Sequence, residues 1–254
     1  MDLGLKGRNA VVLGGTRGIG RAIADTLAGE GAGVAVCARN ADQVAATVTE
    51  LQAMGVKATG ASVDITDAAA LKSWIADAAR ELGSVDMLFS NAGAMAQGGD
   101  PASWEQNFRL DVLGAVNAFE AARPLLEASG EKTGDAAFVI ISSISAAQAD
   151  SASSYGPIKA ALIHMAKGLA RQYAGKKIRV NVVSPGTVYF RGAVSGTWSS
   201  RTCRSATRMR WRATRPAAWR RRRKSPMPRC SWQARPPPSR RVRTSSSTAR
   251  SRTG

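Results

Sequence analysis

Short apolar segments alternate with longer amphipathic segments from residue 9 to residue 186. The apolar segments span residues 9–14, 33–38, 57–64, 85–93, 136–143 and 178–186, and the segments with helical spacing span 19–30, 41–54, 67–83, 104–126 and 153–174. Strands that alternate with helices of this length form a parallel sheet with helices on both faces. The sequence therefore predicts a single α/β domain with a doubly wound parallel sheet over residues 1–190.

The charge of the chain is divided unevenly at about residue 190. The 254 residues include 36 Lys and Arg against 18 Asp and Glu, a net charge of +18. Residues 191–254 contain 19 of these cations and no acidic residue, which leaves residues 1–190 nearly neutral. The composition therefore predicts a globular domain followed by an Arg-rich tail, and the tail is expected to be largely disordered because it lacks an apolar face to bury.

Three glycines lie where the first predicted strand turns into the first helix. Gly14, Gly18 and Gly20 occur in the stretch VVLGGTRGIG. Backbone without side chains lets a pyrophosphate approach the N–H groups at a helix N-terminus. The turn therefore indicates a Rossmann-type dinucleotide site, and a tight turn without a ligand is the alternative when the glycines are taken alone.

A tyrosine and a lysine lie four residues apart in the stretch SSYGPIKAAL of the last predicted helix, so Tyr155 and Lys159 share one helix face. A free phenol ionises only near pH ~10, and a neighbouring ammonium stabilises the phenolate. Such a pair can exchange a proton near neutral pH, whereas surface packing is the usual reason for this spacing by itself. The glycine turn upstream and the serine pair Ser142 and Ser143 favour the acid–base interpretation.

Together these motifs resemble the short-chain dehydrogenase/reductase family over residues 5–190. The matching stretches are GGTRGIG, VDITD with Asp64, SNAG (90–93), ISS followed by Y-x-x-x-K, and SPG (184–186). Two positions here depart from the family: Leu13, before the first stretch, stands where the family usually has Thr, and Ser90 stands for the usual Asn. The resemblance implies an oxidoreductase that transfers hydride between a nicotinamide and a carbonyl or alcohol substrate, similar to an oxoacyl reductase.

The resemblance also implies roles for the candidate catalytic residues. Ser143 would hydrogen-bond the substrate carbonyl, with Ser142 as the alternative if the following loop is one residue shorter. Tyr155 would exchange the proton, and Lys159 would hold the ribose. Asp111 stands where the family usually has a catalytic Asn. Since an ionised Asp only accepts hydrogen bonds, we expect it to hold a relay water or to act on Lys159; a structural role at a helix kink is the alternative.

Two arginines favour NADP over NAD. NAD-binding proteins tend to end the second strand with an acid that binds the ribose 2′-OH, but here that strand ends CARN with Arg39, and Arg17 lies in the glycine turn. Both cations suit a 2′-phosphate, and two solvated surface arginines are the alternative. The expected cofactor-binding residues are Gly14, Thr16, Arg17, Gly18, Ile19, Gly20, Arg39, Asp64, Asn91, Ala92, Gly93, Tyr155, Lys159, Pro185, Gly186 and Val188.

The Arg-rich tail (191–254) has two interpretations. Its arginines and interleaved tryptophans could bind nucleic acid, which would make the chain a Rossmann module with a basic arm. However, Lys224 is its only lysine, a composition typical of GC-rich codons read in the wrong frame. Reverse translation offset by one base turns residues 220–234 into TPEEIANAAVFLAS and residues 240–251 into TGTNLVVDGALT. These strings match the last helix and strand of the family, so we expect one base to be missing after codon 190; an inactive chain is a further possibility.

The remaining expectations concern partners and location. No metal site is expected, because the three cysteines show no ligand spacing and the only histidine, His164, lies in an apolar helical run where it is expected to pack. No apolar run approaches ~20 residues, so no membrane span is expected, and the lack of an export pattern predicts a cytoplasmic protein. The expected partner is a small carbonyl or alcohol substrate rather than nucleic acid. A family-type dimer or tetramer is expected only with the tail in frame.

Overall fold

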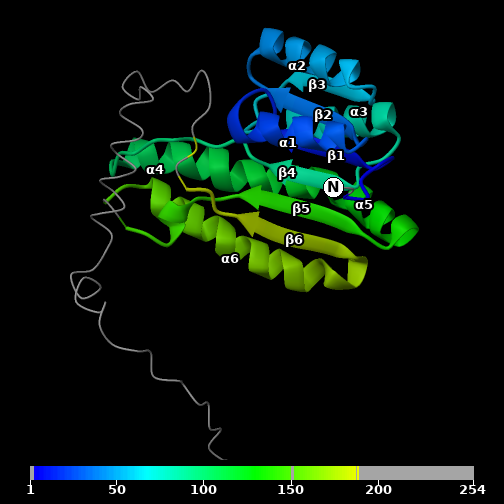
Figure 1. The fold of residues 1–254 in the computed structure, drawn as a ribbon. Helices are drawn as coiled ribbons and strands as arrows, with labels where there is room; N and C mark the ends of the chain where they lie inside the picture. Colours follow the sequence, from blue (N-terminus) through cyan, green and yellow to red (C-terminus); the bar gives the residue numbers. More distant parts are fainter. Residues whose placement is uncertain (1–2, 150–151, 187, 189–254) are drawn as a thin grey trace, which may run out of the picture. The chain divides into compact units, whose positions relative to one another are not determined.

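Six parallel strands form one sheet in the computed structural model, which describes residues 3–149, 152–186 and 188. The strands are β1 (Asn9–Leu13), β2 (Gly33–Ala38), β3 (Ala58–Ser62), β4 (Met87–Ser90), β5 (Ala136–Ile141) and β6 (Ile178–Val183). Their order across the sheet is β3-β2-β1-β4-β5-β6 (Figure 1). This is the order of a doubly wound Rossmann sheet and confirms the predicted fold class. The Arg-rich tail, with the predictions of disorder and of a shifted reading frame, lies outside the described residues.

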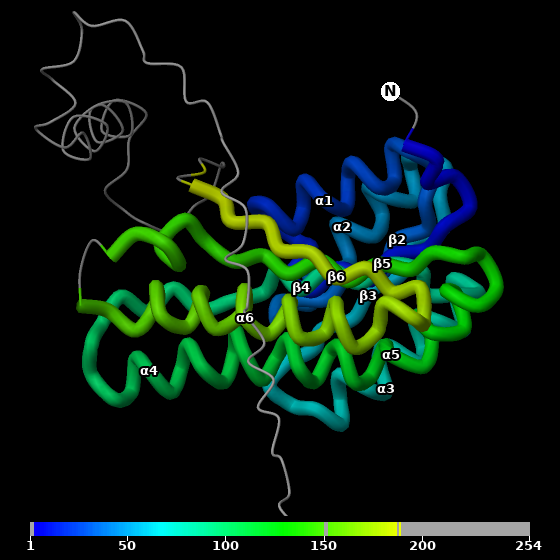
Figure 2. The backbone as a smooth tube through the Cα atoms, turned by 90° about the horizontal axis from the view of Figure 1, so that it is seen from below, coloured from blue at the N-terminus to red at the C-terminus, as the bar shows by residue number. Residues whose placement is uncertain are grey.

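Helices cover the two faces of the sheet, as Figure 2 shows. One face carries α1 (Gly18–Gly29) and α2 (Ala41–Ala53), and the other carries α3 (Ala68–Leu82), α5 (Gly114–Thr133) and α6 (Tyr155–Tyr173). Alternate residues of each strand fill the two layers: Val11 and Leu13 of β1 pack in the layer of α3 and α5, and Ala10 and Val12 pack in the layer of α1 and α2. The near-continuous apolar runs in the sequence are therefore explained by burial on both faces.

The longest helical segment extends beyond its predicted bounds. The sequence predicts a helix over 104–126, and the structure shows α4 (Pro101–Asn107), a π-helical turn (Phe108–Leu113) and α5 following one another without a break. Asp100 caps the start by accepting a hydrogen bond from the N–H of Ser103 (3.0 Å). Gly134 ends the segment at φ 78°, which glycine adopts without a steric penalty. Asp111 lies in the π-helical turn and is buried.

The prediction that His164 packs in the interior is wrong. Its side chain is on the exposed face of α6, whereas Ile158, Lys159, Leu162 and Ala166 form the buried face. The apolar residues beside His164 in the sequence misled the prediction, because α6 carries apolar residues outside its buried face as well.

The two faces of β6 differ in their cover. Ile178 and Val180 are buried on the side of α6, whereas Arg179, Asn181 and Val183 are exposed on the other side. α1 and α2 pack on β1, β2 and β3, and no described helix packs on the exposed face of β6. Val183 is apolar and yet 48% exposed. The described residues thus leave part of one sheet face without a covering layer.

Candidate active site

The candidate site forms where the order of the strands reverses, between β1 and β4. Leu13 pairs with Ser90 at the carboxyl ends of these strands, so that the residues after them lie next to each other. The side-chain amide of Asn91 donates a hydrogen bond to the Gly14 carbonyl (3.0 Å), and the N–H of Ala92 donates to the Leu13 carbonyl (3.0 Å). The two loops are thereby held together at the point where α/β sheets of this kind bind their ligands.

The glycine turn leaves no room for side chains. Gly14 has φ +70°, and a Cβ on it would lie 3.0 Å from the Cα of Ala92. A Cβ on Gly20 would lie 2.1 Å from the Gly14 carbonyl oxygen, so α1 can approach β1 this closely only with glycine there. No side chain caps the N-terminus of α1, and its first turn has no acidic residue. These features fit a pyrophosphate, whose oxygens would accept hydrogen bonds from the uncapped N–H groups.

Two cations and one carboxylate lie at the outer end of this cradle. Arg17 directly precedes α1 and Arg39 directly follows β2, and both side chains are exposed. Hydrogen bonds from the N–H and the hydroxyl of Thr66 hold the pKa of the Asp64 carboxyl below its usual range, and the positive charge of Arg39 acts in the same direction. Asp64 is therefore ionised at neutral pH, as an acceptor for an adenine amino group would be.

A tyrosine, a lysine and an aspartate come together at the start of α6. The ammonium of Lys159 lies 5.5 Å from the centre of the Tyr155 ring and forms an ion pair with Asp111. It also donates a hydrogen bond to the Ile141 carbonyl (3.3 Å). Both members of the ion pair are buried, and Gly93 lies against them, since a Cβ on it would be 2.7 Å from Asp111 Oδ1. Tyr155 is partly exposed, in contrast to the buried ion pair beside it.

The structure distinguishes the two candidate serines. The hydroxyl of Ser142 donates to the Lys159 carbonyl (2.8 Å) and is therefore committed to holding α6 against β5. The oxygen of Ser143 accepts a hydrogen bond from the N–H of Ser145 (3.2 Å), and its proton has no acceptor among the described residues. Of the two, Ser143 is the one that can donate a hydrogen bond to a substrate oxygen.

The loop after β6 is attached next to these serines. The carbonyl of Pro185 accepts a hydrogen bond from the N–H of Ile144 (3.0 Å), one residue after Ser143. Gly186 and Val188 follow, and both are exposed. The structure thus brings the SPG motif to the tyrosine side of the site, opposite the glycine turn.

Asn107 and Ser154 are site-forming residues that the sequence analysis missed. The amide of Asn107 is fully buried, donates to the Ala96 carbonyl (2.9 Å) and to the hydroxyl of Ser154 (2.8 Å), and accepts from the N–H of Ala96 (3.3 Å). Ser154 in turn donates to the Gly98 carbonyl from its hydroxyl and its N–H (3.0 Å each). Together they join the loop after β4 to the residue before Tyr155. The available signal was a polar residue four positions before Asp111, on the same helix face.

Replacing Asn107 by Leu is expected to destabilise the protein by about 2–4 kcal/mol, because the part-buried N–H and carbonyl groups of Ala96 lose their partner and the buried hydroxyl of Ser154 loses one of its two hydrogen bonds. Urea unfolding followed by circular dichroism measures the change. Gln106→Leu is the matched control: Gln106 is exposed on the same helix and should shift the free energy of unfolding by less than about 0.5 kcal/mol. Equal stability of the two variants would contradict the role of Asn107 in joining the loop after β4 to Ser154.

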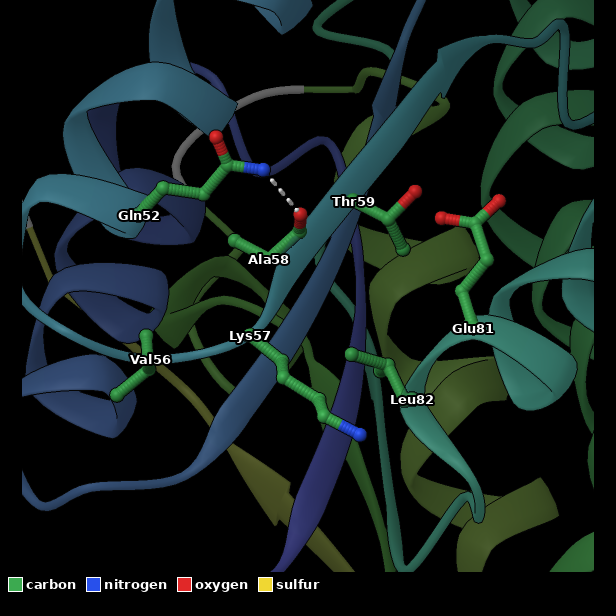
Figure 3. Close-up of a pocket in the computed structure, with 7 residues that line it drawn as sticks. All are labelled: Gln52, Val56, Lys57, Ala58, Thr59, Glu81 and Leu82. Carbon is green, nitrogen blue, oxygen red and sulfur yellow. Dashed lines mark hydrogen bonds between the residues drawn. The ribbon is translucent and has the colours of Figure 1, made fainter.

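A pocket elsewhere on the surface does not belong to this site (Figure 3). It is lined by Gln52, Val56, Lys57, Ala58, Thr59, Glu81 and Leu82. Ala58 is the first residue of β3, so the pocket lies at the amino edge of the parallel sheet, whereas the residues described above lie at the carboxyl edge. The side chain of Gln52 closes part of it by donating to the Ala58 carbonyl (2.9 Å).

The described part of the chain contains no group of three or more His, Cys, Asp or Glu side chains arranged to hold a metal ion. No described helix is both long and apolar enough to cross a lipid bilayer. Burial raises the pKa of the Cys37 thiol to about 12, so this thiol stays protonated at neutral pH and is a poor nucleophile.

A Rossmann sheet with a glycine cradle at its switch point and a Tyr–Lys pair beside it defines a nicotinamide-dependent oxidoreductase acting on an alcohol or a carbonyl group. The chain belongs to the short chain dehydrogenase family, whose sequence model matches residues 8–195. This confirms the resemblance from the motifs.

Relatives with known names are similar over most of the chain. The isoepoxydon dehydrogenase patN of Penicillium expansum is 34% identical over 78% of this chain and 76% of its own length. The rhamnolipids biosynthesis 3-oxoacyl-[acyl-carrier-protein] reductase of Pseudomonas aeruginosa is 36% identical over 72% of this chain and 73% of its own. Among solved structures, a putative short-chain alcohol dehydrogenase from Sinorhizobium meliloti matches with a TM-score of 0.72 and 31% identity, over 82% of each chain. The RhlG/NADP active-site complex of Pseudomonas aeruginosa matches with a TM-score of 0.66 and 34% identity, over 75% of each.

Proposed function

We propose that the protein reduces a carbonyl substrate with NADPH. The observation that carries this proposal is the position of Tyr155 beside the Lys159 ammonium, at the edge of the sheet where the glycine turn would hold a dinucleotide. When bound, the nicotinamide supplies the hydride. Tyr155 donates its phenolic proton to the substrate oxygen, and Ser143 holds that oxygen with its free hydroxyl proton.

The cofactor would lie along the carboxyl edge of the sheet. The backbone from Gly14 to Gly20 would bind the pyrophosphate, and Asp64 the adenine. Lys159 would bind the nicotinamide ribose, with Asn91 to Gly93 along its side. The loop with Pro185, Gly186 and Val188 would contact the nicotinamide. This arrangement is supported by the uncapped N-terminus of α1 and by the hydrogen bond that holds Pro185 next to the serines.

A 3-oxoacyl thioester is the substrate class that we test first. The Pseudomonas aeruginosa relative is named a 3-oxoacyl-[acyl-carrier-protein] reductase, and its share of identical residues is as high as that of the isoepoxydon dehydrogenase. The loop after β4 (94–100) contains small and polar residues, with the exposed Met95 as its one large apolar side chain. The small side chains of this loop support the choice of an extended acyl group as the first substrate to test.

The proposal is tested by following NADPH absorbance with the full chain. The panel contains 3-oxoacyl thioesters, small ketones and steroid ketones. Substrate-dependent oxidation of NADPH supports the proposed reaction, and the best member of the panel names the substrate class. Failure to bind either nicotinamide dinucleotide, measured by quenching of protein fluorescence, would overturn it.

The preference for NADP is expected to depend on Arg39. An Arg39→Asp variant should lose about 10- to 100-fold in affinity for NADPH relative to NADH, because a charge-assisted hydrogen bond to the 2′-phosphate is lost and a repulsive charge takes its place. Fluorescence titration with each dinucleotide measures the ratio. Arg171→Asp is the control, since Arg171 is exposed in the last turn of α6, at the other edge of the sheet. An unchanged ratio in Arg39→Asp would mean that this side chain does not bind the phosphate.

A further inference from the structure

Asp111 and Lys159 form a buried ion pair, and the Lys159 ammonium lies 5.5 Å from the centre of the Tyr155 ring. The side chains of Asp111 and Lys159 are 1% and 7% exposed. Asp111 Oδ2 accepts a hydrogen bond from the N–H of Ala94 (2.8 Å), and Oδ1 has the Lys159 ammonium as its ionic partner but makes no hydrogen bond to any described group. The carboxylate is therefore fixed from one side by the loop after β4 and faces the ammonium on the other.

The carboxylate changes the charge that Tyr155 experiences. An asparagine at position 111 would be neutral, and the phenol would face the full positive charge of Lys159. With aspartate, the two opposite charges are in contact, so the ammonium stabilises a phenolate less. In a buried site the effect of one unit charge at this range is large, because solvent screens it little.

Among the described residues, no other buried charge lies near the phenol. Of the charged residues that the structure describes, only Asp86, Asp111 and Lys159 are buried, and Asp86 is at the amino edge, where it accepts a hydrogen bond from the N–H of Asn9 (2.7 Å). The elements packed against α6 carry further charges on the surface. Glu105 of α4 pairs with Arg109 of the π-helical turn (3.7 Å), and both are exposed, as is Asp100 at the start of α4. Arg179 of β6 pairs with Asp135 (2.7 Å). On α6 itself, Lys167 and Arg171 are exposed in the later turns.

We propose that Asp111 is a positioning residue that offsets the charge of Lys159 and so keeps Tyr155 protonated to higher pH. A protonated phenol is the form that donates a proton to a carbonyl oxygen. Asp111 thus extends toward alkaline pH the range in which the enzyme reduces its substrate, at the expense of the phenolate that alcohol oxidation needs. The inference rests on the proposed function for its meaning, but the ionisation of Tyr155 can be measured without turnover.

The test is a spectrophotometric pH titration of tyrosinate in the full chain and in Asp111→Asn. The chain has three tyrosines, so the same titration of Tyr155→Phe in each background is subtracted to isolate Tyr155. In Asp111→Asn the phenol should ionise at a lower pH than in the parent. Asp111→Ser removes the same charge with a smaller side chain and should give a shift of the same sign if the Asn variant folds poorly. An unchanged or higher midpoint in both would overturn the inference.

Two further measurements separate this inference from the proposed function. Asp100→Asn removes an exposed carboxylate from the cap of α4 and should leave the midpoint unchanged. In turnover, the alkaline limit of carbonyl reduction should move down by the same amount as the titration midpoint in Asp111→Asn. A shifted midpoint without any NADPH oxidation would reject the proposed function and keep the charge effect. Turnover with an unshifted midpoint would support the proposed function and overturn the proposed effect of Asp111 on Tyr155.

Discussion

Tyr155→Phe is expected to lower kcat/KM for carbonyl reduction by about a thousandfold, because the variant loses the phenolic proton that the described part of the candidate site offers. Its aromatic ring still packs beside Lys159, so the fold and the cradle at the glycine turn should be unaffected. The dissociation constant for NADPH should therefore stay within a few-fold of the parent value. Stopped-flow or steady-state absorbance of NADPH measures the first quantity, and fluorescence titration measures the second.

Tyr173→Phe is the matched control for this variant. Tyr173 is the last residue of α6, and its ring packs edge-on against Phe119 (5.0 Å between centroids), at the opposite edge of the sheet. Removing its hydroxyl should leave turnover unchanged. If Tyr155→Phe kept more than about a tenth of the parent rate, a general acid other than Tyr155 would have to act, since proton transfer of this kind contributes at least about a hundredfold.

The sheet and its connection to a dinucleotide site could be predicted from the sequence because both depend on local patterns. Val11, Val12 and Leu13 lie in an apolar run that only burial on two faces explains, and the run ends at Gly14, where the chain must turn into a helix. The spacing of Tyr155 and Lys159 places them on one helix face without knowledge of the rest of the fold. These features need no information about distant parts of the chain.

The features that the sequence did not predict all depend on contacts between distant residues. The amide of Asn107 is satisfied by Ala96 and Ser154, which the sequence places 11 and 47 residues away. The choice between Ser142 and Ser143 depends on which hydroxyl meets the Lys159 carbonyl. The sequence offered a relay water or an effect on Lys159 as roles for Asp111, and the direct ion pair can be seen only when the two helices are placed together.

Restoring the reading frame after codon 190 is the second change that we expect to have a large effect on stability and activity. The exposed face of β6 carries Arg179 and Asn181 and ends at the apolar Val183, and the described residues do not cover it. A strand that continues such a sheet must be apolar, and residues 240–251 as written, RRVRTSSSTARS, contain only two apolar residues. The same bases read in the shifted frame permit TGTNLVVDGALT, which has an apolar centre, and TPEEIANAAVFLAS ahead of it has the acidic start and apolar run of a helix.

A gene with one cytosine inserted after codon 190 should encode a more stable protein. Burying Val183 and the apolar residues of a covering helix and strand contributes about 1.5–3 kcal/mol for each large side chain, so a rise of several kcal/mol in the free energy of unfolding is expected. The restored chain should also form a dimer or tetramer, as expected from the family resemblance, and reduce its substrate faster than the chain as written. Urea unfolding, light scattering and NADPH absorbance measure the three changes.

The matched control inserts a whole codon at the same place, which lengthens the chain by one residue and keeps the Arg-rich tail (191–254). Because only the single-base insertion changes the tail, a gain confined to it must come from the restored sequence. If both insertions gave the parent stability, or if the Arg-rich chain alone bound DNA or RNA with a steep dependence on salt, the tail would have to be a translated basic arm rather than a misread end of the domain. If the tail is a misread end of the domain, the restored sequence should cover the exposed face of β6. If the tail is a basic arm, it should leave that face uncovered.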